Sequence, residues 1–379
     1  MSQRLGGLAA VTLLLSACSG TGPQTTLEPQ GPLAREIDGL WQLVFVIATV
    51  VFILVEAVLV ISIIRFRERK GDDRQPKQIH GNTRLEIMWT IIPAVLLAVL
   101  AVPTVQGIFT VRTPATGADV LDVKVIGHQW WWEFEYPGII DAEGNTLTTA
   151  NELHIPADRP VNLTMTSVDV IHSFWVPPLQ GKRDVVPGRL STLTIEADPE
   201  VPTTDYGFGD GVIPGQCAEF CGLAHADMRL RVFVHDDDGF QAWSDDQLQP
   251  AVVAASGQAA DGFATFTSVC TACHQATVQQ PDGTVETVGE GNSVTVDDIV
   301  FSAALAPDLT HFGSRTTFGG ASFDNTPEHL AAWIDNPPAL KPMDPDRNDI
   351  PAGRILGMPD FGLSTEEIDS LVTMLEEWQ

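Results

Sequence analysis

Three apolar stretches dominate the first third of the chain. The first, Leu5 to Ala17, follows Arg4 and is too short to span a bilayer, which needs about 20 apolar residues, so it is typical of a signal peptide. Trp41 to Ile64 and Leu85 to Phe109 are both long enough to span. Helices that are apolar on every side need a membrane or a very large protein around them. The pattern therefore predicts a two-helix transmembrane hairpin over residues 40–109.

The signal-peptide stretch ends in Leu15-Ser16-Ala17-Cys18, which is similar to a bacterial lipobox. We therefore expect a signal peptide with a lipobox over residues 1–18, a lipidated Cys18 and an N-terminal tether over residues 19–39. The alternative is a signal peptide with an incidental cysteine.

Charge between the two spans indicates their orientation. Residues 65–84 hold seven Lys or Arg and three acidic residues, which by the positive-inside rule places this loop in the cytoplasm. The N-terminus and everything after Phe109 are then extracytoplasmic, on the outer side of the bacterial inner membrane. Glu56 lies within the first span and should face a protein partner or a water-filled path. Glu86 lies near the start of the second span, on its cytoplasmic side, where a charged residue at the membrane interface is common.

Beyond Asp119 the pattern becomes that of short strands. β-branched and aromatic segments alternate with Gly, Pro and Asp, and the clearest are residues 129–136, 160–167, 190–197 and 229–235. Several short strands at such spacing predict an all-β sandwich or barrel over residues 110–248, closed by a short helix from Phe240 to Leu248.

Composition sharpens this division and excludes one class of function. The chain of 379 residues has a formal net charge of −28, which disfavours a nucleic-acid partner because phosphates are repelled. Residues 1–108 hold 9 basic and 8 acidic residues, whereas residues 109–379 hold 12 and 41. A nearly neutral membrane part and a strongly acidic outer part indicate two environments.

Metal-binding residue types gather in one segment of the β region. Two thiols, an imidazole and a thioether lie within twelve residues, at Cys217, Cys221, His225 and Met228. Soft sulfur ligands favour copper, and His172 is the candidate for a second imidazole. A structural zinc site or a disulfide is an alternative, but neither uses the thioether. A single blue-copper site uses one thiolate, so the second cysteine here suggests two thiolates that bridge a pair of copper ions.

The last third has its own chemistry. Residues 249–260 are predicted to be a linker, and Cys270-Thr-Ala-Cys273-His274 is the haem c attachment signature. The thiols add to the haem vinyl groups and His274 binds the iron. Met358, in a loop before a C-terminal helix with a capping box at Ser364–Glu367, is the preferred sixth ligand. Met343 and then His311 are the alternatives, and residues 279–296 are expected to be an insertion loop.

Several strings together resemble subunit 2 of the haem–copper cytochrome c oxidases. They are Gly127-His-Gln-Trp-Trp-Trp132, Asp169-Val-Ile-His172-Ser-Phe, Pro187-Gly-Arg189 and Cys-x-Glu-x-Cys-Gly-x-x-His-x-x-Met, and the resemblance covers about residues 35–248. It implies a cupredoxin-like all-β barrel with a dinuclear copper A centre. The implied ligands are His172, Cys217, Cys221, His225, Met228 and the backbone carbonyl of Glu219, whose side chain would also reach a Mg or Mn ion shared with subunit 1.

The resemblance also implies roles for two other residues. Trp130 matches the tryptophan at which the family receives electrons, and Glu86 matches a glutamate at the mouth of a proton channel into subunit 1. The last part, residues 261–379, resembles a class I cytochrome c and is expected to be an all-α domain. The fold class expected is therefore multidomain.

The function implied is that of subunit 2 of a bacterial cytochrome c oxidase. Electrons would come from cytochrome c, or from the cytochrome of an upstream quinol-oxidising complex, through haem c and copper A to the haem of subunit 1, where oxygen is reduced and protons are pumped. Quinol oxidases use a similar subunit without the copper ligands, and all ligand positions are filled here. Expected partners are subunit 1, other oxidase subunits and membrane lipid. The alternative is a membrane-anchored haem c and copper carrier that serves another reductase.

Overall fold

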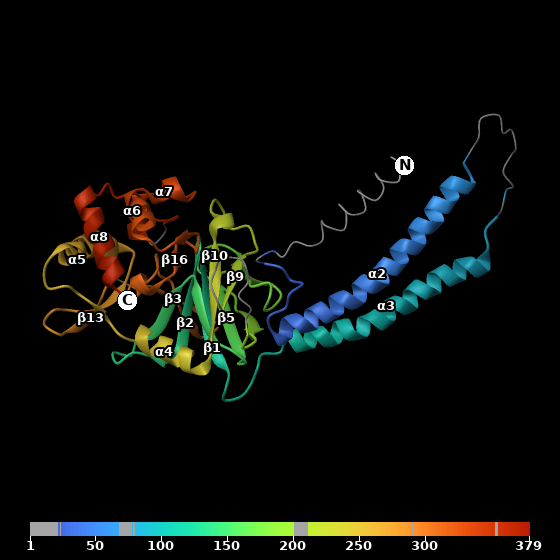
Figure 1. Cartoon of the computed structure of the whole chain (residues 1–379), viewed down its shortest axis with the longest axis horizontal. Helices are drawn as coiled ribbons and strands as arrows, with labels where there is room; N and C mark the ends of the chain where they lie inside the picture. The colour runs from blue at the N-terminus through green and yellow to red at the C-terminus, as the bar shows by residue number, and fades with distance from the viewer. Residues whose placement is uncertain are drawn as a thin grey trace, which may run out of the picture. The chain divides into compact units, whose positions relative to one another are not determined.

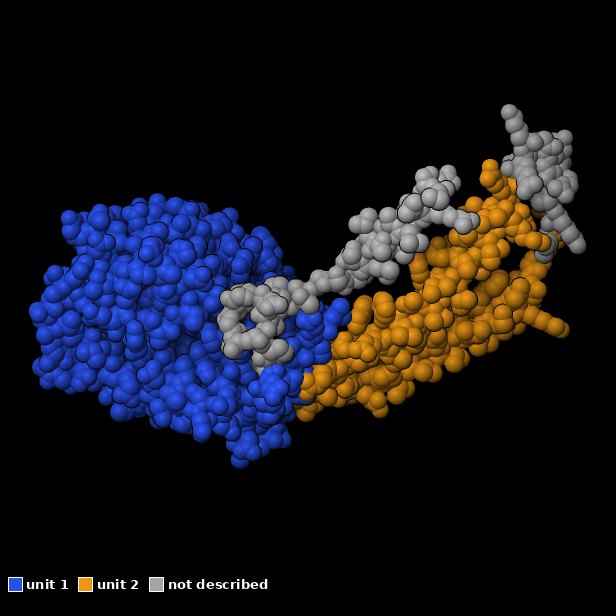
Figure 2. Space-filling view, in the orientation of Figure 1, with its two compact units in different colours: residues 1–32, 114–379 blue, residues 33–113 orange. Residues whose placement is uncertain are grey.

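The computed structural model describes residues 22, 24–67, 78, 80–200, 211–289, 291–352 and 355–379. The predicted signal peptide, Cys18 and most of the basic loop between the two apolar helices lie outside these residues. The chain divides into two compact units, residues 33–113 and residues 1–32 with 114–379 (Figure 2).

The smaller unit holds two long apolar helices. They are α2 (Pro32–Arg65) and α3 (Thr83–Arg112), and both are long and apolar enough to cross a membrane. α2 begins within the residues predicted to form a tether. α3 contains Pro93 and Pro103. Proline lacks a backbone N–H, but membrane helices tolerate it because neighbouring groups satisfy the freed carbonyls. Nearly all large apolar side chains on both helices are exposed, as expected of surfaces that meet lipid or other membrane helices.

A β-rich, cupredoxin-like domain forms the first part of the larger unit (Figure 1). It consists of two five-stranded sheets, of order β3-β2-β1-β5-β8 and β4-β10-β9-β6-β7. The strands are β1 (Leu121–His128), β2 (Trp131–Ile140), β3 (Thr146–Ala150), β4 (Glu152–Pro156), β5 (Val161–Ser167), β6 (His172–Trp175), β7 (Arg183–Val185), β8 (Ser191–Ile195), β9 (Val212–Cys217) and β10 (Arg229–His235). The predicted strands correspond to β2, β5, β8 and β10.

Large apolar side chains from both sheets fill the interior of this barrel. Trp132, Phe134 and Tyr136 are completely buried along β2, and Phe174 of β6 packs edge-on against the first two. The helix α4 (Asp237–Gln247) follows β10, close to the predicted closing helix. Because β9 and β6 are neighbours in one sheet, the chain brings residue 172 and residue 217 to the same end of the barrel.

The C-terminal segment combines helices with short strands. Its helices are α5 (Gln258–Val269), α6 (Pro327–Asp335), α7 (Pro337–Leu340) and α8 (Thr365–Glu377). Its strands are β11 (Ala251–Val252), β12 (Ala276–Gln279), β13 (Val285–Val288), β14 (Ser293–Val296), β15 (Ile299–Ser302), β16 (Thr317–Phe318) and β17 (Phe323–Asp324). The expected all-α fold is therefore wrong in part. The core of the segment is helical, because α5 packs against α8 so closely that a Cβ at Gly262 would overlap the carbonyl of Ser370.

The predicted insertion loop at residues 279–296 contains β13 and β14. Antiparallel pairs β12–β13 and β14–β15 make two hairpins there. The β-branched residues Val and Thr, which favour strands, make up most of Val285-Glu-Thr-Val288 and Ser293-Val-Thr-Val296, and Gly283, with φ of +87°, makes the turn of the first hairpin. The acidic and glycine-rich residues around these short strands obscured the signal. In the predicted linker, Ala251 and Val252 pair with β12. The capping box at the start of α8 is confirmed.

Candidate metal centre and cofactor cavity

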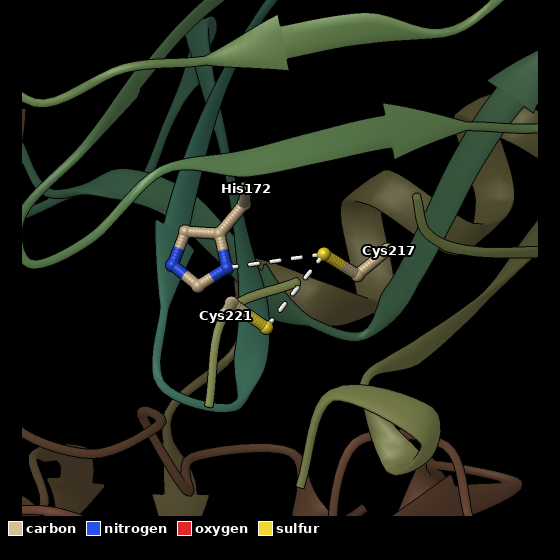
Figure 3. A group of neighbouring side chains, drawn as sticks. All are labelled: His172, Cys217 and Cys221. Carbon is tan, nitrogen blue, oxygen red and sulfur yellow. Dashed lines mark hydrogen bonds between the residues drawn. The ribbon is translucent and has the colours of Figure 1, made fainter. Parts of the chain in front are cut away.

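Two thiols and an imidazole converge at one end of the barrel. Cys217 is the last residue of β9, and His172 is the first residue of the neighbouring strand β6. The Cys217 sulfur lies 4.0 Å from His172 Nδ1 and 3.8 Å from the Cys221 sulfur (Figure 3). All three residues are buried, and their ligand atoms lie within 4.8 Å of one another. The thiols are too far apart to be joined by a bond of about 2.05 Å.

The loop from β9 to β10 adds the remaining candidate ligands. His225 Nδ1 lies 3.5 Å from the Cys221 sulfur, and the Met228 thioether lies 3.8 Å from that same sulfur. The carbonyl of Glu219 is 3.2 Å from the Cys217 sulfur, while the Glu219 side chain is exposed. The structure thus brings together every residue predicted to ligate copper. A set of two thiolates, two imidazoles, a thioether and a carbonyl fits a pair of soft metal ions.

Hydrogen bonds hold the candidate ligands in orientations and protonation states that suit metal binding. Asp169 accepts a hydrogen bond from His172 Nε2 at 2.8 Å, which leaves Nδ1 directed at Cys217. The hydrogen bond from the Cys221 thiol lowers the pKa of Cys217 well below that of a free cysteine. A thiolate and an imidazole with an oriented lone pair are the forms that bind metals.

The turn between β1 and β2 supports the loop that carries the ligands. Trp130 Nε1 and Gln129 Nε2 both donate to the carbonyl of Cys221, at 2.9 and 2.7 Å. Gly222, with φ of +113°, passes beside them, and a Cβ there would lie 3.1 Å from the Trp130 ring. The backbone amide of Gln129 also donates to Asp169 at 2.6 Å. One turn therefore positions residues on both sides of the candidate metal centre.

A second site lies in the C-terminal segment, where Cys270, Cys273 and His274 line one cavity. His274 Nδ1 is 2.8 Å from the carbonyl of Pro307, which leaves Nε2 for a metal ion. Burial lowers the pKa of His274 to about 4, so its imidazole is neutral, as an iron ligand must be. The residues at this cavity fit a covalently held haem c.

Two methionines reach the same cavity. Met358 and Met343 both line it, and Met343 packs against Gly357 next to Met358. Arg315 and Trp333 line it as well, whereas His311 is not among the lining residues. Either methionine therefore remains a candidate for the sixth ligand of a haem iron, whereas the position of His311 does not favour it as a ligand.

Trp130 belongs to both sites. It is 4% exposed, it lines the same cavity as Cys273 and His274, and its indole nitrogen donates a hydrogen bond to the carbonyl of Cys221. The sequence singled out Trp130 only by resemblance. Its position between the cavity and the metal-binding loop could not be read from local pattern.

The two glutamates of the helical unit have different surroundings. Glu86 accepts a hydrogen bond from the backbone amide of Asn82 at 3.1 Å, and the Asn82 side chain in turn caps the first turn of α3. This reciprocal cap gives Glu86 a structural role in addition to its predicted one. Glu56 is exposed on α2.

Sequence reasoning missed four residues that support the two sites. Gln129 binds the metal-binding loop and Asp169 orients His172, and the Asp-x-x-His spacing to His172 was the available signal for Asp169. Glu152 and Lys341 join the barrel to the C-terminal segment through contacts over 100 residues apart in sequence. No local pattern marks such contacts.

Comparison with known proteins agrees with this geometry. Family models for the transmembrane and periplasmic domains of cytochrome c oxidase subunit II match residues 25–106 and 138–234. Cytochrome c oxidase subunit 2 of Alkalihalophilus pseudofirmus is 34% identical over 379 residues, covering 99% of this chain and 96% of its own. The protein of the same name from Bacillus subtilis is 34% identical over 350 residues, 88% of each chain. Quinol oxidase subunit 2 of Bacillus spizizenii is 34% identical over 246 residues, 62% of this chain and 69% of its own.

The two relatives named cytochrome c oxidase subunit 2 align with 99% and 88% of this chain. The two regions matched by family models contain most of both apolar helices and most of the barrel. The periplasmic domain of the family implies a copper A centre, which is consistent with the cluster at Cys217 and Cys221. Membership also implies assembly with subunit 1 and other oxidase subunits. The chain thus belongs to the cytochrome c oxidase subunit 2 family and is a membrane-anchored oxidase subunit with a periplasmic domain.

Proposed function

We propose that this chain relays single electrons from a cytochrome donor to the haem of subunit 1. Cys270, Cys273 and His274, with Met358 as the sixth ligand, hold haem c. His172, Cys217, Cys221, His225, Met228 and the carbonyl of Glu219 hold dinuclear copper A. When bound, the haem supplies the site that accepts the electron, and the copper pair supplies a site that passes it on with little rearrangement. The protein contributes ligand geometry, burial and hydrogen bonds that tune both potentials.

The position of Trp130 is the observation that carries this proposal. Trp130 lines the cavity of Cys270 and Cys273, and its indole nitrogen donates a hydrogen bond to the carbonyl of Cys221, a proposed copper ligand. One residue therefore reaches from the wall of the cavity to the metal-binding loop. At 4% exposure, Trp130 is shielded from an external donor, which favours electron transfer by way of the C-terminal segment.

The donor proposed is cytochrome c or the cytochrome of an upstream quinol-oxidising complex. Every copper-ligand position is filled, which a quinol oxidase does not require. The relative named quinol oxidase subunit 2 aligns with 62% of this chain, whereas one named cytochrome c oxidase subunit 2 aligns with 99%. Since the net charge is −28, we expect basic cytochromes c to be steered towards the chain. Oxidation rates that do not change with ionic strength would dismiss this steering.

The remaining parts of the proposal concern the membrane. We propose that α2 and α3 both span the inner membrane, that the N-terminus and the metal sites are extracytoplasmic, and that Cys18 carries a lipid. Glu219, whose side chain is exposed beside the copper loop, would bind a Mg or Mn ion shared with subunit 1. Glu86 remains the candidate for a proton path into subunit 1.

Metal and haem analysis of the purified full chain tests the proposal. We expect about two coppers and one covalent haem per chain. Rapid mixing with reduced cytochrome c should then show haem reduction followed by copper reduction, and Trp130→Phe should slow the second step more than the first. A colourless protein with zinc at Cys217 and Cys221 would overturn the proposal. Failure to copurify with a haem-containing subunit 1 would favour the alternative, a carrier that serves another reductase.

A further inference from the structure

Lys341 is a buried lysine whose amino group, when protonated, has a saturated hydrogen-bond shell. It follows α7 and is only 3% exposed. Its ammonium donates to the backbone carbonyls of Trp130, Asp227 and Gly319, at 3.0, 2.9 and 2.8 Å. An ammonium group has three N–H donors, so these three acceptors use its full capacity.

The three carbonyls belong to three separate segments. Trp130 lies in the turn between β1 and β2, and Asp227 lies in the copper loop, immediately before Met228. Gly319 lies in the turn between β16 and β17 of the C-terminal segment. A single side chain thus joins the copper loop, the turn that carries Trp130 and the segment that forms the haem cavity. Lys341 itself also lines that cavity.

The turn from Gly319 to Ser322 closes tightly around this ammonium. Gly320 has φ of +77°, and a Cβ there would lie 2.5 Å from both the Asp227 carbonyl oxygen and Lys341 Nζ. The Gly320 carbonyl accepts from the amide of Arg229 at 2.9 Å, and the Ser322 hydroxyl donates to the Asp227 carbonyl at 3.1 Å. Only glycine fits at position 320, so the C-terminal segment meets the copper loop backbone to backbone.

Such an arrangement resists small displacements. Moving either partner would leave a buried ammonium or up to three buried carbonyls without hydrogen bonds, each at a substantial cost in free energy. Lys124 provides an informative comparison, because it too joins the barrel to the C-terminal segment. Its ammonium contacts Glu135 at 2.9 Å and the Val300 carbonyl at 2.6 Å, but it belongs neither to the copper loop nor to the cavity.

We propose that Lys341 is a positioning residue that fixes the haem cavity against Trp130 and the copper loop. The ammonium thereby sets the path over which an electron passes from one site to the other. This inference rests on the proposed relay between haem c and copper A. The positioning itself is a property of the protein chain and can be measured without either cofactor.

The experiment compares Lys341→Met with Lys124→Met in the full chain, because both remove an ammonium that joins the two parts. In metal-free protein we expect amide hydrogen exchange at residues 226–231 and 317–322 to accelerate at least tenfold in Lys341→Met and to stay unchanged in Lys124→Met. In protein loaded with both cofactors, haem-to-copper electron transfer after flash reduction should slow about tenfold in Lys341→Met alone.

The two measurements separate failure of this inference from failure of the relay. Unchanged exchange in Lys341→Met, or equal acceleration in Lys124→Met, would overturn the positioning role. Accelerated exchange with an unchanged transfer rate would also overturn it, because the junction would then not set the electron path. If wild-type protein shows no haem-to-copper transfer, the relay fails, while the exchange data still decide whether Lys341 holds the junction.

A second pair of variants covers the case in which Lys341→Met does not fold. Gly320→Ala adds one methyl group against Asp227 and Lys341, whereas Gly283→Ala adds it at φ of +87° with no atom within 4 Å. Both positions have φ in the left-handed region, so both substitutions strain the backbone. We expect only Gly320→Ala to accelerate exchange at residues 226–231 and to slow the transfer. Equal behaviour of the two variants would refute the proposal.

Discussion

Asp169 and His172 form a hydrogen bond of 2.8 Å between a carboxylate oxygen and the ring Nε2 at the edge of the metal cluster. This bond fixes the orientation of the imidazole, so that Nδ1 points at the Cys217 sulfur. A partner of this kind commonly contributes a factor of about 10 to 100 to metal affinity.

Replacement of Asp169 by Asn should therefore weaken copper binding by about 10- to 100-fold, because the amide no longer holds the ring with a charged acceptor. Copper titration of the metal-free full chain, followed by its visible absorption, measures the change. Asp122→Asn, at an exposed position on β1, is the matched control and should bind copper as the wild type does. Equal affinities for the two variants would contradict the role of Asp169.

The two methionines that line the cavity proposed to hold haem c can be distinguished by substitution. Met358→Ala should abolish the absorption band of methionine-bound haem iron at the red end of the spectrum, because the sixth ligand is lost. Met343→Ala should keep the band. Since both side chains line the cavity, the same measurement on both variants decides between them. Loss of the band in Met343→Ala alone would reverse the assignment.

Glu152 should stabilise the junction of the barrel with the C-terminal segment. One carboxylate oxygen of this buried residue accepts hydrogen bonds from the amides and hydroxyls of Thr316 and Thr317, at 2.6 to 3.0 Å. Glu152→Ala leaves these donors unpaired and should lower the free energy of unfolding by about 2 kcal/mol or more. Urea unfolding followed by circular dichroism tests this, with the exposed Glu143→Ala as the control. Similar losses in both variants would show that the carboxylate is not an anchor.

Two stacked imidazoles should make the barrel sensitive to acid. His154 Nδ1 lies 2.9 Å from His235 Nε2, and His154 stacks on Trp243 at 4.1 Å. Burial, and then the charge of the neighbouring imidazole, lower the pKa of His154 well below its usual value, and burial also lowers the pKa of His235. Below pH of about 6.5 the unfolded chain binds protons that the folded chain does not, so stability is present above this pH and is lost as the pH falls.

The melting temperature of the full chain should accordingly fall between pH 7 and pH 5. His154→Phe keeps the stacking on Trp243 but removes a titrating group, so its decrease over the same interval should be smaller. Thermal unfolding in detergent at a series of pH values measures both slopes. Parallel curves for the two proteins would mean that this imidazole pair does not cause the acid sensitivity.

The sequence predicted those features that depend on local pattern or on fixed spacing. The two apolar helices, the strands around Trp132 and the cluster of Cys217, Cys221 and His225 follow from periodicity and ligand spacing. The capping box at Ser364 has an equally local signal. Each of these features is encoded within about a dozen neighbouring residues.

Features that depend on distant contacts were not predictable in the same way. The hairpin strands of residues 276–302 are short, and hairpin β14–β15 is held by hydrogen bonds to Lys124 of β1 and Glu135 of β2. Glu152 and Lys341 carry no motif, because the contacts by which they join the barrel to the C-terminal segment are with residues more than 100 positions away in the sequence. The choice between Met343 and Met358 also depends on how separate loops meet at the cavity.

Hairpin β14–β15 places Val296 and Phe301 against Ile126 of β1, and all three side chains are buried. The amide of Ser302 also donates to Glu135 of β2. A chain truncated after residue 248 would leave the Ile126 side chain exposed on the outside of the barrel. Such an exposed apolar side chain would favour aggregation. The C-terminal segment therefore also covers an apolar side chain of the barrel, and removing the segment would require a polar substitution at Ile126 to keep the barrel soluble.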